Sequence, residues 1–235
     1  MSNPYFAFKQ FTIRHDRCAM KVGTDGVLLG SVAPVEGVQR ILDVGAGTGL
    51  IALMLAQRNA NARIDGVEID EEAAIQAAEN VSASPWSDRV VIRCADFNAF
   101  TPDKLYDAVV SNPPYFVDSL LAPDKGRSQA RHTAGLRFED LLEGVVSCLR
   151  PQGVFSLILP TDVKDLFISL AEERGLYVNR MLWIQTTPTA EPKRIILNLS
   201  FQPTRIEESS LIIELERHRY SEEYISLTKD FYLKM

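Results

Sequence analysis

The chain has 235 residues, of which 46% are hydrophobic and 24% are charged, and these values fit one large globular domain better than two domains. A formal net charge of −6 argues against a protein that coats nucleic acid through bulk positive charge, so any nucleic-acid contact has to be local. The three cysteines lie far apart without CxxC spacing and predict neither a disulfide framework nor a metal site. No segment has the character of a signal peptide or a membrane span, so we expect a cytoplasmic protein.

Short apolar runs alternate with helical patterns along the chain. Runs rich in Val and Ile and bounded by turn residues predict strands at 40–45, 63–70, 89–96, 106–112 and 153–160. Apolar residues at helical spacing predict helices at 49–59, 71–83, 137–149 and 161–174, the last of them capped by Thr161 or Asp162. This alternation predicts a parallel, doubly wound sheet. Two further runs at 177–186 and 193–201 have only a turn between them and predict an antiparallel hairpin that closes the sheet.

The first predicted strand ends in DVGAGTG, at the place where ligands bind in doubly wound sheets. Gly45, Gly47 and Gly49 allow a tight turn and a close approach of a ligand to the backbone. The spacing is GxGxG instead of the GxGxxG of dinucleotide sites. Asp43, which we expect at the edge of the sheet, would accept from a cationic amine and repel a pyrophosphate. A turn that merely needs positive φ is the alternative, but turn and acid together favour a ligand with an ammonium group.

Acids also follow the next two predicted strands. Glu68 at the end of GVEID is placed to accept both hydroxyls of a ribose, whereas Asp70 is expected to cap the following helix. At the end of CADF, Asp96 can accept from the exocyclic amine of an adenine and Phe97 can cover the ring, although a surface turn explains Asp96 equally well. In chain order, these strand ends describe one ligand made of an amino acid, a ribose and an adenine.

The strand ends DVGAGTG, GVEID, CADF and SNPPYF resemble those of the S-adenosylmethionine-dependent methyltransferases, and NPPY marks their amine-methylating branch. The opening FKQFTIRHDRCAMKVGTDGVLLGSV is similar to that of the bacterial enzymes that methylate the exocyclic amine of the adenine after the anticodon in a valine tRNA. Together the matches cover most of residues 5–201. The resemblance implies an α/β, Rossmann-like class I fold with helices on both faces of a seven-stranded, mostly parallel sheet whose last strand is antiparallel. It also implies S-adenosylmethionine as cofactor and tRNA, bound at its anticodon stem-loop, as substrate.

The SNPPYF stretch interrupts the fourth strand, because proline has no N–H to donate to a β-ladder. An exocyclic amine attacks only after its lone pair is localised, so its site needs acceptors more than a strong base. The Asn112 side-chain oxygen and the Pro113 carbonyl can each accept one amine hydrogen, and Pro113 and Pro114 fix the turn that presents them. Tyr115 can stack on the target base and Phe116 can line its pocket. We also expect Asn112 to lie against the cofactor.

Two further segments concern substrate and cofactor binding. The resemblance suggests that KVGTDGVLL, with Lys21 and Thr24, covers the methionine end of the cofactor, although an ordinary helix capped by Thr24 or Asp25 also explains it. Residues 117–135 form a long insertion after the catalytic turn, of the kind that commonly serves as a lid or binding loop. Its cationic side chains could contact RNA phosphates, with solvated surface charge as the alternative; they are Lys125, Arg127, Arg131 and His132. Further candidates for phosphate contacts are Arg14, Arg17, Lys21, Lys193 and Arg194.

We expect a single methyltransferase domain over 1–235, with a covering segment at 1–35, a catalytic core at 36–201 and a C-terminal extension at 202–235. The extension shows a short apolar run followed by a helical pattern. A monomer without a metal ion is expected.

The leading hypothesis is methyl transfer to N6 of an unpaired adenine, adenine 37 of a valine tRNA. Methylation of a guanine at N2 in RNA and methylation of a protein glutamine at N5 are alternatives with the same chemistry. Two other classes remain open. An NAD-dependent oxidoreductase is disfavoured by the GxGxG spacing and Asp43, and a non-catalytic RNA-binding module is disfavoured by the acidic net charge.

Overall fold

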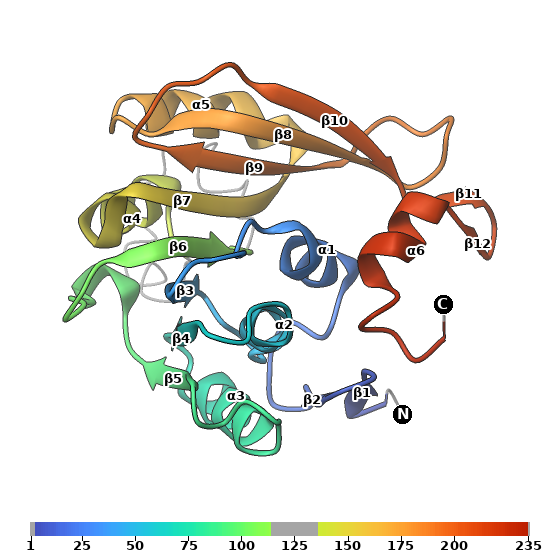
Figure 1. Cartoon of the computed structure of the whole chain (residues 1–235), viewed down its shortest axis with the longest axis horizontal. Helices are drawn as coiled ribbons and strands as arrows, with labels where there is room; N and C mark the ends of the chain where they lie inside the picture. The colour runs from blue at the N-terminus through green and yellow to red at the C-terminus, as the bar shows by residue number, and fades with distance from the viewer. Residues whose placement is uncertain (1–2, 114–135, 235) are drawn as a thin grey trace, which may run out of the picture.

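The computed structural model describes residues 3–113 and 136–234 (Figure 1). Its elements, in chain order, are β1 (Tyr5–Ala7), β2 (Thr12–Arg14), α1 (Thr24–Val32), β3 (Arg40–Val44), α2 (Leu50–Arg58), β4 (Arg63–Glu68), α3 (Glu71–Ser82), β5 (Val90–Cys94), η1 (Phe97–Ala99), β6 (Tyr106–Ser111), α4 (Phe138–Cys148), β7 (Leu149–Pro160), η4 (Thr161–Val163), α5 (Lys164–Glu172), β8 (Tyr177–Gln185), β9 (Arg194–Ser200), β10 (Glu207–Ile212), β11 (Glu214–Glu216), β12 (Arg219–Tyr220) and α6 (Glu222–Thr228). No helix in these two described ranges is long and apolar enough to cross a bilayer.

The central sheet has the strand order β10-β8-β9-β7-β6-β3-β4-β5. Strands β3 to β7 are parallel, and β9 runs antiparallel to both β7 and β8. The doubly wound sheet and the closing hairpin are therefore confirmed. The implied count of seven strands is wrong, because β10 adds an eighth, parallel to β8. Its burial pattern explains why the sequence did not indicate it, since only Leu211 of this edge strand is fully buried.

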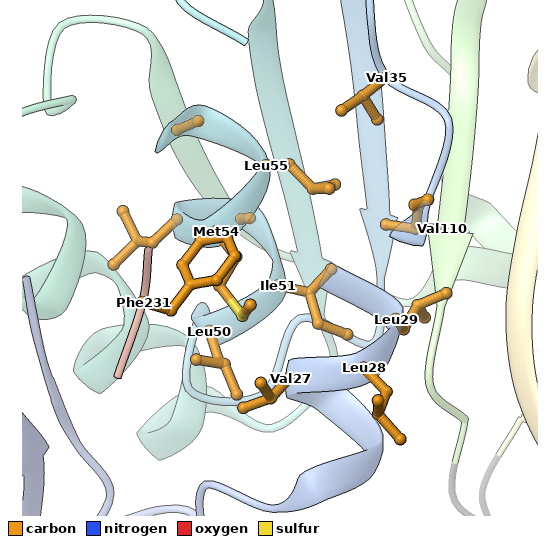
Figure 2. Close-up of a cluster of buried hydrophobic side chains, with 14 of the residues drawn as sticks. Val27, Leu28, Leu29, Val35, Leu50, Ile51, Met54, Leu55, Val110 and Phe231 are labelled. Carbon is orange, nitrogen blue, oxygen red and sulfur yellow. The ribbon is translucent and has the colours of Figure 1, made fainter. Parts of the chain in front are cut away.

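Helices cover both faces of the sheet, as expected (Figure 1). Helices α1, α2, α3 and α6 pack on one face, and α4 and α5 pack on the other. Figure 2 shows part of the hydrophobic core on the face that carries α1 and α2. Side chains of these two helices pack against each other there, and Phe231 belongs to the same cluster. The two helices approach closely at Gly30, where an added Cβ would lie 2.8 Å from the Met54 sulfur. Burial of residues 50–56 on all sides holds α2, and with it the turn that precedes it, against the sheet.

Two predicted helix caps have different outcomes. Asp70 caps α3, since its side chain accepts from the Ala73 N–H at 2.8 Å. The prediction that Thr161 or Asp162 caps the helix at 161–174 is wrong. The 3₁₀ turn η4 comes first, and α5 begins after Val163 without a side-chain cap. The Thr161 hydroxyl instead donates to the Pro192 carbonyl at 3.0 Å, which ties the end of β7 to the turn between β8 and β9.

The two ends of the chain pack together (Figure 1). Phe8 forms an antiparallel bridge with Tyr232, and their rings stack with centroids 5.8 Å apart. The Lys9 backbone N–H donates to the Phe231 carbonyl at 2.7 Å. The short β1–β2 hairpin is thus joined to the segment that follows α6.

Candidate active site at the carboxyl edge of the sheet

Strand order reverses at β3, which lies between β4 on one side and β6 on the other. The registers place the ends of these strands side by side, with Val44 opposite both Val67 and Ser111. Glu68, at the end of β4, is opposite Cys94 of β5. The motifs that follow the four strands therefore converge at one edge, where doubly wound sheets bind their ligands.

The glycine turn has the open backbone that the sequence predicts. Gly45, Gly47 and Gly49 have φ values of 72°, 53° and 79°, in the left-handed region that other residues adopt only with strain. The turn rests on β4, because the N–H groups of Gly45 and Ala46 both donate to the Val67 carbonyl, at 2.9 and 3.0 Å. The result is a glycine-rich backbone turn at the start of α2, in which a Cβ at Gly45 would meet no atom within 4 Å.

The Glu68 carboxylate accepts two structural hydrogen bonds that the sequence did not predict. Its Oε2 accepts from the Gly47 N–H at 2.8 Å, and its Oε1 accepts from the Asp70 N–H at 2.9 Å. The carboxylate thereby fixes both the glycine turn and the start of α3. Each oxygen keeps a second lone pair, so the group can still accept from two ribose hydroxyls. The ribose contact itself stays a prediction.

Asp43 lies one residue before the end of β3 and is fully buried there, which the sequence did not indicate. Its side chain is 0% exposed, because β3 is covered on both faces and Asp43 points beneath the glycine turn. The Ala52 N–H donates to Oδ2 at 3.1 Å, whereas Oδ1 is buried without a partner among the described residues. Burial raises the pKa of Asp43 to about 7, the Ala52 hydrogen bond opposes this, and the Glu68 carboxylate adds to it. An unfilled acceptor at this place suits the ammonium group of the expected cofactor, S-adenosylmethionine.

We expect the affinity for S-adenosylmethionine to increase as the pH rises from about 5.5 to about 7.5, because the cation favours ionised Asp43 and its binding displaces the proton. Stability of the cofactor-free chain should fall as the pH rises from about 4 towards about 7, since the folded chain then retains a proton that the unfolded chain has lost. Calorimetry and urea unfolding at several pH values measure both effects. Asp43→Asn is the matched control, and equal pH dependence in the variant and the parent would exclude Asp43 as the group.

The two candidate residues that follow β5, Asp96 and Phe97, both make contacts within the protein. Asp96 is exposed and its Oδ1 accepts from the Asn98 N–H at 2.9 Å, which is the local turn considered as the alternative. Phe97 is only 6% exposed and lies against α4, where the ring leaves no room for a Cβ on Gly144. Contact of Asp96 with an adenine amine stays a prediction. Cover of the adenine by Phe97 also stays a prediction, limited to the small exposed part of the ring.

The catalytic turn begins directly after β6. The Ser111 hydroxyl donates to the Val44 carbonyl at 2.9 Å, so the end of β6 is tied to the end of β3 and Asn112 starts next to the glycine turn. Asn112 is half-buried and Pro113 is buried. Their role as acceptors stays a prediction. The remaining candidates lie outside the described residues: Pro114, Tyr115, Phe116, Lys125, Arg127, Arg131 and His132.

Residues 15–24, which we call the strap, lead from β2 to α1 past this edge. Gln76 and Asn80 of α3 hold the start of the strap and are 1% and 3% exposed. The Arg17 N–H donates to Gln76 Oε1 at 3.1 Å, and Asn80 Nδ2 donates to both the Arg14 and Thr48 carbonyls at 2.9 Å. Two amides four residues apart on the buried face of an amphipathic helix were the signal that the sequence offered for this contact.

The strap passes close to the ribose end of the predicted cofactor site. Burial, followed by the nearby carboxylates of Glu68 and Asp70, raises the pKa of the Cys18 thiol to about 11. Thr24 is exposed and begins α1, whose N-cap is Gly23, so neither Thr24 nor Asp25 caps this helix. Lys21 is exposed. Cofactor contacts by Lys21 and Thr24 stay predictions.

Comparison with known proteins identifies the family. The model of the Methyltransferase small domain matches residues 19–158. A tRNA1(Val) (adenine(37)-N6)-methyltransferase of Phocaeicola vulgatus is 54% identical over 235 residues, the whole of both chains. Its counterpart from Pectobacterium carotovorum is 46% identical over 98% of this chain and 94% of its own. The chain belongs to the tRNA1(Val) (adenine(37)-N6)-methyltransferase family. A methyltransferase of this family is neither an NAD-dependent oxidoreductase nor a non-catalytic RNA-binding module.

The fold of this methyltransferase also has relatives among solved structures. The crystal structure of a "predicted O-methyltransferase" from Agrobacterium tumefaciens has a TM-score of 0.68 and 23% identity, and the match covers 88% of this chain and 96% of the other. At that identity the likeness concerns the fold alone. It agrees with the class I architecture that the strand ends implied.

Proposed function

We propose that this S-adenosylmethionine-dependent methyltransferase methylates N6 of adenine 37, next to the anticodon of a valine tRNA. The observation that carries the proposal is full-length similarity to enzymes of that name, at 46–54% identity. The glycine turn, Glu68 and the start of the NPPY motif meet at one sheet edge, as this chemistry requires. We also infer that residues 1–235 act as a single methyltransferase domain.

When bound, the cofactor supplies a methyl group on a sulfonium. Asp43 would hold its ammonium group and Glu68 its ribose, which the unpartnered Asp43 Oδ1 and the contact of Glu68 with the glycine turn support. The Ser111 hydrogen bond to Val44 would keep Asn112 near the same site. The Asn112 side-chain oxygen and the Pro113 carbonyl each accept one hydrogen of the target amine, which directs its lone pair out of the ring plane. The nitrogen loses a proton after transfer, so alignment of the reacting atoms accounts for most of the rate without a general base.

The substrate proposal follows from where the acceptors lie. A base whose amine reaches Asn112 has to leave its stack, which costs a few kcal/mol in a duplex and least in an unpaired loop. An adenine in the anticodon loop meets that condition. Because the chain carries a net charge of −6, its RNA contacts have to come from local cations at this edge, such as Arg14 and Lys193.

The identity of the product tests this function. Valine tRNA treated with enzyme and cofactor is digested to nucleosides and examined by mass spectrometry, and N6-methyladenosine is the expected product. A valine tRNA with guanine in place of adenine 37 is the matched control and should stay unmodified. Methylguanosine from either RNA would instead support methylation of guanine at N2. Methylated glutamine, recovered after incubation of total protein with enzyme and labelled cofactor, would support methylation of a protein glutamine.

A further inference from the structure

An ion pair joins the start of α1 to the far side of the sheet. Arg194 Nε lies 2.8 Å from Asp25 Oδ2, although 169 positions separate the two residues in the chain. Their side chains are 35% and 29% exposed, so the pair is partly shielded from water. A partly buried contact of this kind loses less strength to solvent screening than a surface ion pair does.

The registers place this pair at the same edge of the sheet as the catalytic turn. Arg194 opens β9 and is opposite Pro160 of β7. Strand β7 separates β9 from β6, and Ser111 at the end of β6 is opposite Leu157. Arg194 therefore lies three positions further toward the carboxyl edge than Ser111, two strands away from it. At about 4.8 Å between neighbouring strands, this is a lateral separation of about 10 Å.

The pair also lies on the face of the sheet that α1 covers. Alternate residues of a strand share a face, so Arg194 faces the same side as Ile196. Ile196, and Val110 near the end of β6, both belong to the core beneath α1. The ion pair thus borders the same side of the edge as Val110, which comes two residues before the first predicted acceptor.

The ion pair holds the end of the strap, whereas Gln76 holds its beginning. Gln76 of α3 holds its beginning at Arg17, on the side of the sheet where β4 and β5 lie. Arg194 holds the residue that follows its end, on the opposite side. Strands β4, β3, β6 and β7 lie between these two points, so the strap crosses the ends of the strands that form the predicted cofactor site.

We infer that Arg194 and Asp25 are positioning residues for the reaction. Their ion pair fixes the end of the strap over the cofactor, and it thereby sets cofactor affinity and the alignment of the methyl group with the target amine. The inference rests on the proposed function in one respect, that S-adenosylmethionine binds beneath the strap. It reassigns Arg194, which the sequence analysis offered as a phosphate contact.

Five variants test the pair: Asp25→Asn, Arg194→Gln, the combination of these two changes, Arg194→Lys, and the exchange Asp25→Arg with Arg194→Asp. Calorimetry without RNA should show about tenfold weaker cofactor binding for Asp25→Asn and for Arg194→Gln. A double variant carrying both changes should be no weaker than either, and the exchange and Arg194→Lys should recover part of the loss. Arg205→Gln is the matched control, since it removes an exposed arginine from the turn between β9 and β10, at the opposite edge of the sheet, and should leave cofactor affinity unchanged.

Kinetics separate positioning from a phosphate contact. We expect both single variants to lower kcat while the salt dependence of the KM for tRNA stays as in the parent chain. The inference is overturned if Asp25→Asn binds cofactor normally while Arg194→Gln alone raises that KM and reduces its salt slope by about one. If Arg194→Gln does not fold, the isosteric Asp25→Asn decides by itself. Because cofactor affinity is measured without RNA, the result does not depend on which nucleoside is methylated.

Discussion

Asn112→Ala should lower kcat for methyl transfer by about 10²- to 10³-fold, the usual cost of removing a preorganised donor or acceptor from a transition state. The side-chain oxygen is expected to accept from the target amine, and without it the lone pair stays delocalised in the ring. Cofactor affinity should change by less than about threefold, because Asp43, Glu68 and the glycine turn are untouched. Single-turnover kinetics and calorimetry measure the two quantities separately.

Two further variants make this result specific. Asn112→Asp keeps an acceptor oxygen of the same size and should retain more activity than the alanine variant does. Asn61→Ala removes an exposed asparagine from the turn between α2 and β4, at the opposite edge, and should behave like the parent chain. Wild-type turnover in Asn112→Ala would show that the lone pair is localised by some other group.

Asp65→Ala should reduce the free energy of unfolding by about 3–5 kcal/mol, because it removes the acceptor of the buried Tyr106 hydroxyl and one counter-charge of the largely buried Arg40. Asp65 lies in β4, and its side chain is 12% exposed. It accepts from the Tyr106 hydroxyl at 2.9 Å and from Arg93 Nη2 at 3.1 Å, and Arg40 Nη2 lies 3.4 Å away. The group thus connects β4 with its neighbours β3 and β5 and with β6. Burial, together with Asp65, raises the pKa of Tyr106 well above its usual range, so the phenol stays a neutral donor.

Urea unfolding measures this effect, and Asp103→Ala is its control. Asp103 also pairs with Arg40, at 3.1 Å, but its side chain is 72% exposed. Removing such a surface partner should cost less than about 1 kcal/mol. Equal losses in the two variants would mean that burial does not determine the contribution of this network.

The order of the core strands and helices could be predicted from the sequence, because the patterns that indicate them are local. Each core strand is a short run of β-branched and aliphatic residues, and each helix that follows has its own apolar stripe. The DVGAGTG turn was equally direct, since left-handed backbone needs glycine. Strand β10 gave no such signal, because an edge strand with one fully buried side chain has little apolar pattern.

Features that depend on contacts between distant segments could not be predicted from the sequence. The sequence did not indicate that Asp43 is buried, because its burial depends on the glycine turn and α2, which cover it. Thr161 was expected to cap a helix, yet its hydroxyl is taken by Pro192 from a turn about 30 residues later. The position of a residue in the sequence indicates which strand it follows. It does not indicate which distant residues contact its side chain in the folded chain.

The contact between Phe8 and Tyr232 has a consequence for synthesis of the chain. A ribosome, which adds roughly 5–20 residues per second, makes Phe8 long before it makes Tyr232. The β1–β2 hairpin, which precedes the strap, therefore lacks its aromatic partner until the segment after α6 has emerged. Nascent chains should form the sheet before the strap is fixed over the cofactor edge, so methyl transfer should begin only after that segment has left the ribosome.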